Sequence, residues 1–494
     1  MMSRKIILFL TALASPVSHA DVAITLDAFI DTILNNNPGV QRILEQEAIA
    51  AGQLESSLGI DDPLLSTSGG LSRTEFEKIA GFEADSSNNL EMAVGVDRVF
   101  SDTGTRASVS YGNTYTDRSP ALPSDLGATF HQPSLTLRLT QPLLDNAGGI
   151  QDRLNINLNR LNHAFARLDS REQLESYITQ LAALYLDWYQ AFREVEILEA
   201  AWNKVQEQEK LVRLKVSRQV AEEYELLRIQ ETLEDYYSRW QQADANYLGL
   251  ARQIEKQMNR PAEAQQQPAT VLVPVDSENA SLLQPVTDSK PDYLATDSNL
   301  KAILDNLKAQ QDELLAARDN SRKADLGLSL EYRRHGANSE FVDAHSGDLD
   351  KNDYSVMLEY SYPLGNRSAS GAYQTQLASK RQVAADTAQQ LLDAEAALAD
   401  LQAREEKLAE ALAAADRKIR LATRKLVKEQ ELYRIGQLDL FELLQDATTQ
   451  LESRLSRTRL YVQLQQIRLS IRELLDRNLQ PIPSGALTHG SAPG

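Results

Sequence analysis

The chain contains no cysteine, which excludes disulfide bonds, thiolate metal sites and a lipidated N-terminal cysteine. It also lacks an excess of basic residues, because 70 acidic residues face 51 basic ones and the formal net charge is −19. Nucleic-acid binding needs a basic footprint. We therefore expect no nucleic-acid partner.

Motifs that carry catalysis are also missing. The sequence has no GxSxG motif, no phosphate-binding Walker loop and no paired-histidine motif, and its six histidines are scattered. His335 and His345 flank Asp343 in a segment expected to be a loop. This spacing is a weak metal-site signal, and we expect solvent-exposed side chains there instead. The sequence predicts no catalytic residue, no metal and no cofactor, so we do not expect an enzyme.

Proline and glycine are nearly absent from two long stretches. Residues 143–260 and 364–480 contain no proline and very few glycines. Helix interiors exclude both residues, because proline removes a backbone donor and glycine costs about 1 kcal/mol relative to alanine. At about 1.5 Å per residue, the longest uninterrupted runs would form rods of roughly 100 Å. The sequence predicts long helices over residues 150–217, 220–258, 367–435 and 437–479.

The N-terminus has the pattern of a secretory signal peptide over residues 1–20. Arg4 and Lys5 precede an apolar core at residues 6–14, and Ser18-His19-Ala20 provides a cleavage site. This core is too short to span a bilayer, and no other run reaches the roughly 18 apolar residues of a membrane helix. If the exported chain crosses a membrane, it must do so as a closed barrel.

The two halves of the chain follow the same plan. Asn37-Pro38 opens a helical stretch that extends to about Gly59, and Lys290-Pro291 opens one to about Ser321. Strands, a long helix, a break and a shorter helix follow in each half. We therefore predict an internally duplicated fold. Its parts are a first repeat at 21–260, a connector at 261–290, a second repeat at 291–479 and a disordered tail at 480–494.

Alternating apolar and polar residues predict the strands. The pattern is clear at 325–334, 353–363 and 135–139, and weak at 64–71. One apolar and one polar face is typical of outer-membrane strands, although a soluble sheet with one wet face shows the same pattern. Exposed sheet edges are forbidden in lipid. Several copies of the chain would therefore have to share one barrel.

The first half carries an additional segment at about residues 86–127. It has its own alternation on both sides of Asp102-Thr103-Gly104, which predicts a hairpin. The hairpin either adds two strands per copy or forms an extracellular or periplasmic flap. We favour added strands or strand extensions.

The predicted helices are amphipathic with heptad-like spacing, as in Leu391, Ala394, Leu398 and Leu401. Coiled-coil packing needs such a seam. A structural coiled-coil scaffold protein would show the same spacing, and periodicity alone does not exclude it.

Several short motifs now resemble those of the TolC family of outer-membrane efflux ducts, over roughly residues 24–479. They are Asn37-Pro38, the strand-to-helix elbows at 141–145 and 362–367, and the segment 433–444 with the sequence YRIGQLDLFELL. Each is weak alone, but their order and spacing are specific.

The resemblance implies an α+β membrane protein: a homotrimer whose transmembrane β-barrel is continuous with a long periplasmic α-helical coiled-coil tunnel. Such a protein sits in the outer-membrane lipid of a Gram-negative bacterium and extends into the periplasm. It is the passive exit duct of a tripartite efflux pump or a type I secretion system, and has porin activity. A periplasmic adaptor and an inner-membrane transporter dock on it. The resemblance does not specify the cargo, which could be a drug, a metal ion or a secreted protein. The alternative function is a periplasmic coiled-coil adaptor or scaffold without a pore.

The same resemblance implies a gate at the helical breaks. The positions of the family's acidic ring fall at Glu442 and Gln445, with Asp446 beside them. Three copies of one carboxylate around a three-fold axis attract cations. The alternative is that Glu442 and Asp446 are solvated residues near a helix N-terminus, where acids are favourable in any case.

The family's closing contact implies a pair between Tyr433 and Glu223. A family arginine that helps to lock the gate is replaced by Leu438, so the lock is either weaker or built from Arg434 and Glu222. Gly436 permits the turn between the helices, because glycine alone enters left-handed conformations freely.

Overall fold

The computed structural model of the chain describes residues 22–77, 84–119, 128–259, 272–275, 280–286, 292–346 and 349–479. The predicted signal peptide, the tail and most of the predicted connector lie outside these ranges. The chain folds into two compact units, each built from both of its halves. The helical unit comprises Met1–Leu44, Ser170–Asn299 and Leu391–Gly494, and the sheet unit comprises Glu45–Asp169 and Leu300–Gln390. The predicted division into two sequence repeats therefore differs from the division into compact units, and stays a prediction.

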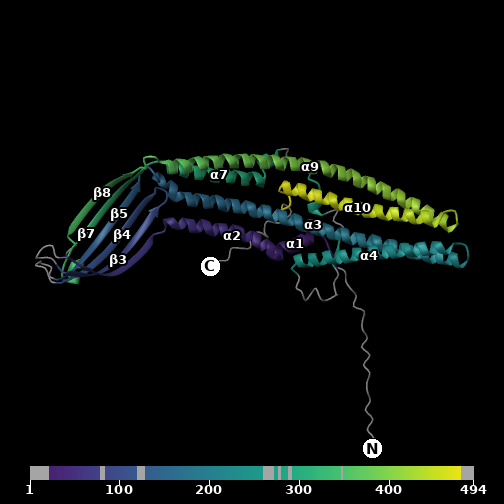
Figure 1. The fold of residues 1–494 in the computed structure, drawn as a ribbon, viewed down its shortest axis with the longest axis horizontal. Helices are drawn as coiled ribbons and strands as arrows, with labels where there is room; N and C mark the ends of the chain where they lie inside the picture. Colours follow the sequence, from purple (N-terminus) through teal and green to yellow (C-terminus); the bar gives the residue numbers. More distant parts are fainter. Residues whose placement is uncertain are drawn as a thin grey trace, which may run out of the picture. The chain divides into compact units, whose positions relative to one another are not determined.

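The sheet unit contains one antiparallel sheet of six strands in the order β2-β3-β4-β5-β7-β8 (Figure 1). The strands are β2 (Leu64–Glu75), β3 (Ser86–Phe100), β4 (Thr105–Ser119), β5 (Thr129–Pro142), β7 (Asp325–His335) and β8 (Lys351–Ser361). The predicted extra hairpin forms β3 and β4, which are inside the sheet and pair with β2 and β5. The alternative in which the hairpin is a separate flap is wrong.

The strand register keeps apolar side chains on one face of the sheet. Residues directly opposite one another from β2 to β8 form an apolar row: Leu65, Val96, Val109, Leu137, Tyr332 and Tyr354. The neighbouring row on the other face is mostly polar: Ser66, Gly95, Ser110, Thr136, Arg333 and Asp353. Since side chains alternate between the faces of a strand, the sequence alternation becomes one apolar and one polar face.

The turn between β3 and β4 is docked against the start of the helix that follows β5. A Cβ atom on Gly149, which has φ +66°, would lie 1.7 Å from the carbonyl oxygen of Ser101. Asp61 accepts hydrogen bonds from the Ser101 backbone N–H at 2.7 Å and from its hydroxyl at 2.8 Å. Arg98 Nε donates to the Asp61 carbonyl oxygen at 3.0 Å. The hairpin is therefore fixed at its turn as well as along its strands.

Helices precede and follow the strands along the chain. They are α2 (Pro38–Leu58), α7 (Asn299–Asn320) and the short α8 (Phe341–Ser346), with single 3₁₀ turns η1 (Gly59–Asp61) and η2 (Ala147–Gly149). The helix predicted over 291–321 is in fact interrupted, because α6 (Tyr293–Thr296) ends before α7 begins. Beside the interruption, Asp476 accepts hydrogen bonds from the Asn299 backbone N–H and the Tyr293 hydroxyl, both at 2.9 Å.

Two pairs of long helices run through the chain. The first helix of each pair, α3 (Ile150–Ser217) and α9 (Arg367–Arg434), has 68 residues and contributes to both units. The second helix, α4 (Glu223–Gln257) or α10 (Leu440–Leu474), has 35 residues. These equal lengths agree with the internal duplication, which stays a prediction. Among the described residues, no helix is both long and apolar enough to cross a membrane.

The helical unit has two apolar cores. One core joins α1 (Leu26–Asn36) to the middle of α3 through residues such as Phe29, Ile33 and Trp188. It also includes η3 (Ser281–Leu283) and a small parallel pair, β1 (Val22–Ile24) with β6 (Leu272–Pro274). The sequence did not predict this pair, because three residues are too few to show periodicity. The second core joins the ends of α3 and α9 to the starts of α4 and α10.

A group of buried acids lies beside the first core. Glu175 on α3 has no exposed surface, and neither of its carboxylate oxygens has a hydrogen-bond partner. Arg171 Nε is 3.9 Å away. Burial raises the pKa of Glu175 to about 8, with a further contribution from Asp476. Burial and Asp476 likewise raise the pKa of Glu172 to about 7. Glu175 therefore holds its proton near neutral pH.

Candidate gate at the helical breaks

Both helical breaks turn through a left-handed residue. The second break contains Gly436 at φ +80°, and a Cβ atom there would meet no heavy atom within 4 Å. Glycine is favoured at this position by its backbone angle rather than by lack of space. In the first break the left-handed residue is Gln219, at φ +59°.

The helices that leave the breaks begin differently. The Asp439 carboxylate accepts a hydrogen bond from the Phe441 backbone N–H at 3.3 Å and caps α10. Glu222 stands at the equivalent position before α4, but its side chain makes no capping hydrogen bond. The first turn of both helices contains acids: Glu223 and Glu225 on α4, and Glu442 on α10. The helix dipole stabilises negative charge at these positions.

Tyr433 links the two breaks. It is 4% exposed, and its hydroxyl donates to Glu225 Oε2 at 3.5 Å. Lys215 Nζ lies 3.7 Å from the centre of the Tyr433 ring and donates to the Tyr433 carbonyl oxygen at 2.8 Å. Burial, with the Glu225 carboxylate adding to it, raises the pKa of Tyr433 to about 12. The phenol thus stays a neutral hydrogen-bond donor over the physiological range.

The partner of Tyr433 within the chain is Glu225 rather than the predicted Glu223. The two acids are two residues apart on α4, so they point to nearly opposite sides of the helix. Glu223 is exposed, while Glu225 is half-buried against Tyr433. A gate role for Glu223 stays a prediction.

A second contact between the breaks involves stacked side chains. The Arg228 guanidinium lies 4.8 Å from the ring centre of Tyr224 and 4.6 Å from that of Phe441. This arginine on α4 therefore reaches the first turn of α10. Cation–π contacts at partly exposed sites contribute about 0.5–1 kcal/mol each.

The predicted acidic positions have two different environments. Glu442 and Gln445 are exposed on α10. Asp446 is half-buried and pairs with Lys425 Nζ at 2.5 Å, and the same lysine lies 3.3 Å from Glu429. Lys425 lowers the pKa of Asp446, whereas burial raises the pKa of Glu429. The carboxylate of Asp446 is thus neutralised within its own chain.

The alternative lock has no direct contact within the chain. Arg434 and Glu222 are both exposed, and in the described part of the chain no ion pair joins them. The residues that do connect the breaks, Lys215, Glu225 and Arg228, were missed by the sequence analysis. Only the i,i+4 spacing of Lys425 and Glu429 was visible in the sequence as a possible pair.

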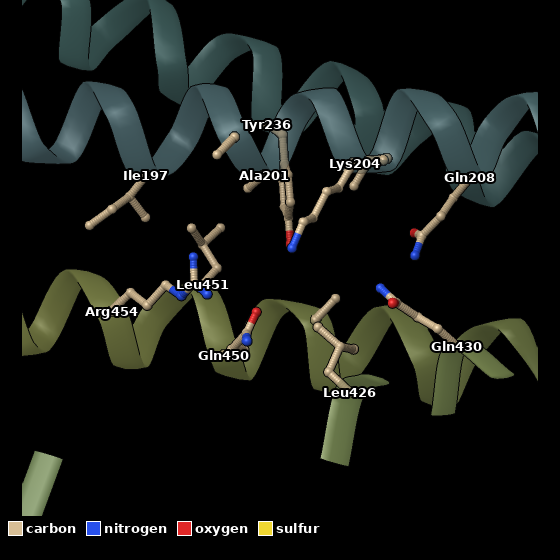
Figure 2. A pocket seen from close by; sticks show the side chains of 13 residues that line it. Ile197, Ala201, Lys204, Gln208, Tyr236, Leu426, Gln430, Gln450, Leu451 and Arg454 are labelled. Atoms are coloured by element: carbon tan, nitrogen blue, oxygen red, sulfur yellow. The ribbon is translucent and has the colours of Figure 1, made fainter. Parts of the chain in front are cut away.

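A small cavity lies near the breaks, between the α3–α4 pair and the α9–α10 pair (Figure 2). It encloses about 40 Å³, and Tyr236, Gln208 and Gln430 are among its lining residues. Gln208 Oε1 is buried there without a hydrogen-bond partner. Ligand pockets are usually about 300–1,000 Å³, whereas a water needs only about 10–15 Å³. The cavity has room for water but not for an organic ligand.

No three His, Asp or Glu side chains are grouped to hold a metal ion in the ranges that the structure covers. The segment expected to be a loop with exposed histidines differs in the structure. His335 ends β7, His345 lies on the helix α8, and both are half-buried. His335 Nε2 lies 3.1 Å from Asp353, and His345 Nδ1 lies 2.7 Å from the Phe341 carbonyl oxygen.

Several solved structures are similar to this chain in overall fold. No protein-family model matches the chain, and no curated protein matches it either. The structure of the CusC channel matches with a TM-score of 0.68 and 14% identity, covering 91% of this chain and 91% of that chain. The Campylobacter jejuni CmeC outer membrane channel matches with a TM-score of 0.67 and 13% identity, covering 92% and 86%. The open state of the Neisseria gonorrhoeae MtrE outer membrane channel gives 0.64 and 13%, covering 92% and 89%.

The chain has the fold of these outer-membrane channels. The resemblance to TolC-like proteins that the sequence predicted is confirmed at this level. At 13–14% identity, the likeness establishes the fold and no more.

Proposed function

We propose that this protein is the outer-membrane exit duct of a tripartite efflux pump or a type I secretion system in a Gram-negative bacterium. It would act as a homotrimer and conduct cargo passively from an inner-membrane transporter, with a periplasmic adaptor joining the two. The observation that carries the proposal is the fold, which matches outer-membrane channels over nearly the whole chain.

The sheet supports a role in lipid. Its apolar face would meet the hydrocarbon, and its polar face would line a water-filled lumen, as in other outer-membrane barrels. The long helices would continue the lumen through the periplasm. A coiled-coil adaptor or scaffold has no need for a six-stranded sheet with one apolar face, which makes this second function the weaker one.

The breaks would form the regulated aperture. Glu442 and Gln445 are exposed in the single chain, so three copies could present them to a shared lumen. Tyr433, Lys215 and Glu225 would hold the two breaks together in the closed state. Asp446 would contribute less to a ring of charge, since Lys425 neutralises it.

Conductance of the purified protein in planar bilayers tests the proposal. We expect discrete ion-conducting pores that prefer cations, and a lower cation preference in Glu442→Ala. Glu395→Ala removes an exposed acid in the middle of α9 and should behave like the wild type. Protein that is soluble without detergent and never conducts would contradict the function. Pores whose cation preference is the same in Glu442→Ala as in the wild type would contradict only the role of Glu442 in the aperture.

Deletion of the gene separates the two classes of cargo. Loss of resistance to drugs indicates an efflux pump, whereas loss of secretion of a protein toxin indicates a type I system. No effect on either process, with the protein present in wild-type outer membranes, would argue against an exit duct.

A further inference from the structure

The buried acids beside the first core meet the end of α10. Glu172 and Glu175 are three residues apart on α3 and therefore lie on the same side of that helix. Asp476, just after α10, is 5% exposed and has a left-handed backbone at φ +52°. After burial, the Asp476 carboxylate is the largest cause of the raised pKa of both glutamates. Three carboxyl groups from two distant parts of the sequence are thus gathered in the helical unit.

The surroundings of Glu175 suit a neutral acid and not a carboxylate. Glu175 has no exposed surface, and both its oxygens lack a hydrogen-bond partner among the described residues. Arg171 Nε, 3.9 Å away, is too distant for a hydrogen bond. The Arg472 guanidinium is also near, but its Nη atoms donate to the carbonyl oxygens of Gln284 and Arg477 at 3.3 and 3.0 Å. A buried carboxylate without donors is strongly disfavoured, so the group takes up a proton.

Asp476 holds the corner between α6 and α7, residues Tyr293–Asn299. Its Oδ2 atom accepts hydrogen bonds from the Tyr293 hydroxyl and the Asn299 backbone N–H, both at 2.9 Å. Burial, with Asp476 adding to it, raises the pKa of Tyr293, so the hydroxyl stays a donor. Asn299 begins α7 and is the last residue of the helical unit before the chain continues into the sheet unit. The end of α10 therefore fastens the corner at both of its ends.

We propose that Glu175 operates a proton-dependent latch, in which the α6–α7 corner stays fastened to the end of α10 while Glu175 is protonated and opens when Glu175 loses its proton. A charged Glu175 would face the Asp476 carboxylate without a donor of its own, and opening the corner would let water reach it. All the groups involved belong to the helical unit of one chain, so the latch does not depend on the proposed function.

Acids outweigh bases around Glu175. Asp476, Glu172 and Glu473 each raise its pKa, whereas Arg171 lowers it. The charged and titratable groups that face Glu175 come from every neighbouring element: Arg171 and Glu172 on α3, Arg472 and Glu473 on α10, Asp476 after α10, and Tyr293 on α6, with Arg477 5.9 Å from the Tyr293 ring centre. Deprotonation therefore adds a negative charge to a mostly acidic surrounding.

The latch should open as pH rises. In the closed corner the pKa of Glu175 is about 8, and in an open, hydrated corner it would return to the ordinary value of 4.5. Opening thus releases one proton between these two values, and the opening equilibrium rises by up to about tenfold per pH unit there. The closed corner is fully favoured below this window, and the dependence ends above about pH 8. Glu172, with a pKa of about 7, would make the rise steeper up to that pH.

Thiol labelling tests the latch, because the natural chain has no cysteine. Ser298→Cys places a thiol in the corner, and Ser453→Cys on α10 is the matched control. The two serines are 3% and 4% exposed, and each donates to the carbonyl oxygen four residues earlier, that of Leu294 or Thr449. Full-length variants in detergent are reacted with a maleimide at pH 6, 7 and 8. The ratio of the two labelling rates corrects for the thiolate fraction, which rises with pH at both sites.

We expect the ratio of the Ser298→Cys rate to the Ser453→Cys rate to rise by at least about tenfold from pH 6 to pH 8. Adding Glu175→Gln should hold the ratio at its pH 6 value, because an amide has no proton to lose. Adding Glu395→Gln, at an exposed position on α9, should leave the rise intact. A ratio that is constant with pH in the wild-type background, or an equal rise with Glu175→Gln, would overturn the latch.

A second variant tests the fastening of the corner without changing the acids. Tyr293→Phe removes one of the two hydrogen bonds to Asp476 and should raise the labelling ratio at every pH. This result is independent of whether Glu175→Gln folds. An unchanged ratio in Tyr293→Phe would show that Asp476 does not hold the corner closed, which would also overturn the proposal.

Discussion

At the scale of single residues, Lys215 makes more contacts across the proposed gate than the hydroxyl of Tyr433, the tyrosine that the sequence identifies. The Tyr433 hydroxyl makes one long hydrogen bond, whereas Lys215 contacts both the ring and the carbonyl oxygen of Tyr433. These two lysine contacts cross from the end of α3 to the end of α9. We therefore expect the proposed aperture to be held mainly by Lys215, a residue that no sequence motif identifies.

Replacing these residues one at a time tests that ranking. Tyr433→Phe removes a single hydrogen bond, which normally contributes about 0.5–1.5 kcal/mol, and should increase conductance only slightly. Lys215→Ala removes both lysine contacts and should produce larger or longer openings in single-channel recordings. Lys210→Ala, an exposed lysine on the same helix, is the control and should leave conductance unchanged. A larger effect from Tyr433→Phe than from Lys215→Ala would refute the ranking.

The buried acid Glu175 makes stability depend on pH. Its pKa of about 8 in the folded chain is above the ordinary value of a carboxyl group, so the folded state binds a proton that the unfolded state has released. Stability therefore falls as pH rises through this window, from about 4.5 to about 8, and Glu172 adds to the fall up to about pH 7.

Glu175→Gln should remove most of this dependence, because a neutral amide requires no proton. Thermal unfolding in detergent at pH 5, 7 and 9 would measure it. We expect the variant to exceed the wild type most at pH 9 and least at pH 5. Glu395→Gln changes an exposed acid and should follow the wild-type curve. Parallel curves for Glu175→Gln and the wild type would exclude this role.

At the scale of elements, the docked hairpin turn depends on one of two adjacent glycines. Gly148 and Gly149 have nearly the same left-handed backbone, at φ +70° and +66°. A Cβ atom on Gly148 would meet nothing within 4 Å, whereas one on Gly149 would overlap the Ser101 carbonyl oxygen. Alanine at Gly148 would therefore add only backbone strain, whereas alanine at Gly149 would add the same strain and a steric overlap.

Gly148→Ala should cost about 1–2 kcal/mol, from the left-handed backbone alone. Gly149→Ala should cost considerably more, because the turn must move away and lose the hydrogen bonds to Asp61. Thermal melts and the yield of inserted protein would compare the two variants. Equal losses would show that the turn is not docked as the structure has it.

Elements were predictable where a signal extends over many residues. Long runs without proline or glycine predicted α3, α4, α9 and α10, and alternation predicted β3, β4, β5, β7 and β8. Contacts between distant residues were not predictable. Asp476, far along the sequence, binds residues on both sides of the interruption before α7. The partner of Tyr433 was predicted two residues away from Glu225. A single sequence carries no signal for such pairings.

At the scale of the whole molecule, the hairpin bears on the width of the barrel that the proposed function requires. The diameter of a barrel grows roughly in proportion to its number of strands. A trimer with six strands per copy, about eighteen in all, would therefore enclose a wider lumen than one whose copies lacked the hairpin. The helical breaks would then be the narrow part of the duct. We therefore expect the breaks to limit the bilayer current of the wild type. Lys215→Ala, which loosens the breaks, should then increase the current.

The left-handed glutamine in the first break has a further consequence. A non-glycine residue in this conformation costs about 1–3 kcal/mol, a penalty that Gly436 avoids. Torsional strain is thus stored at the first break and not at the second. In the proposed duct, we expect the break at Gln219 to open before the one at Gly436. Amide hydrogen exchange that is faster at residues 214–222 than at 432–439 would record this order of release.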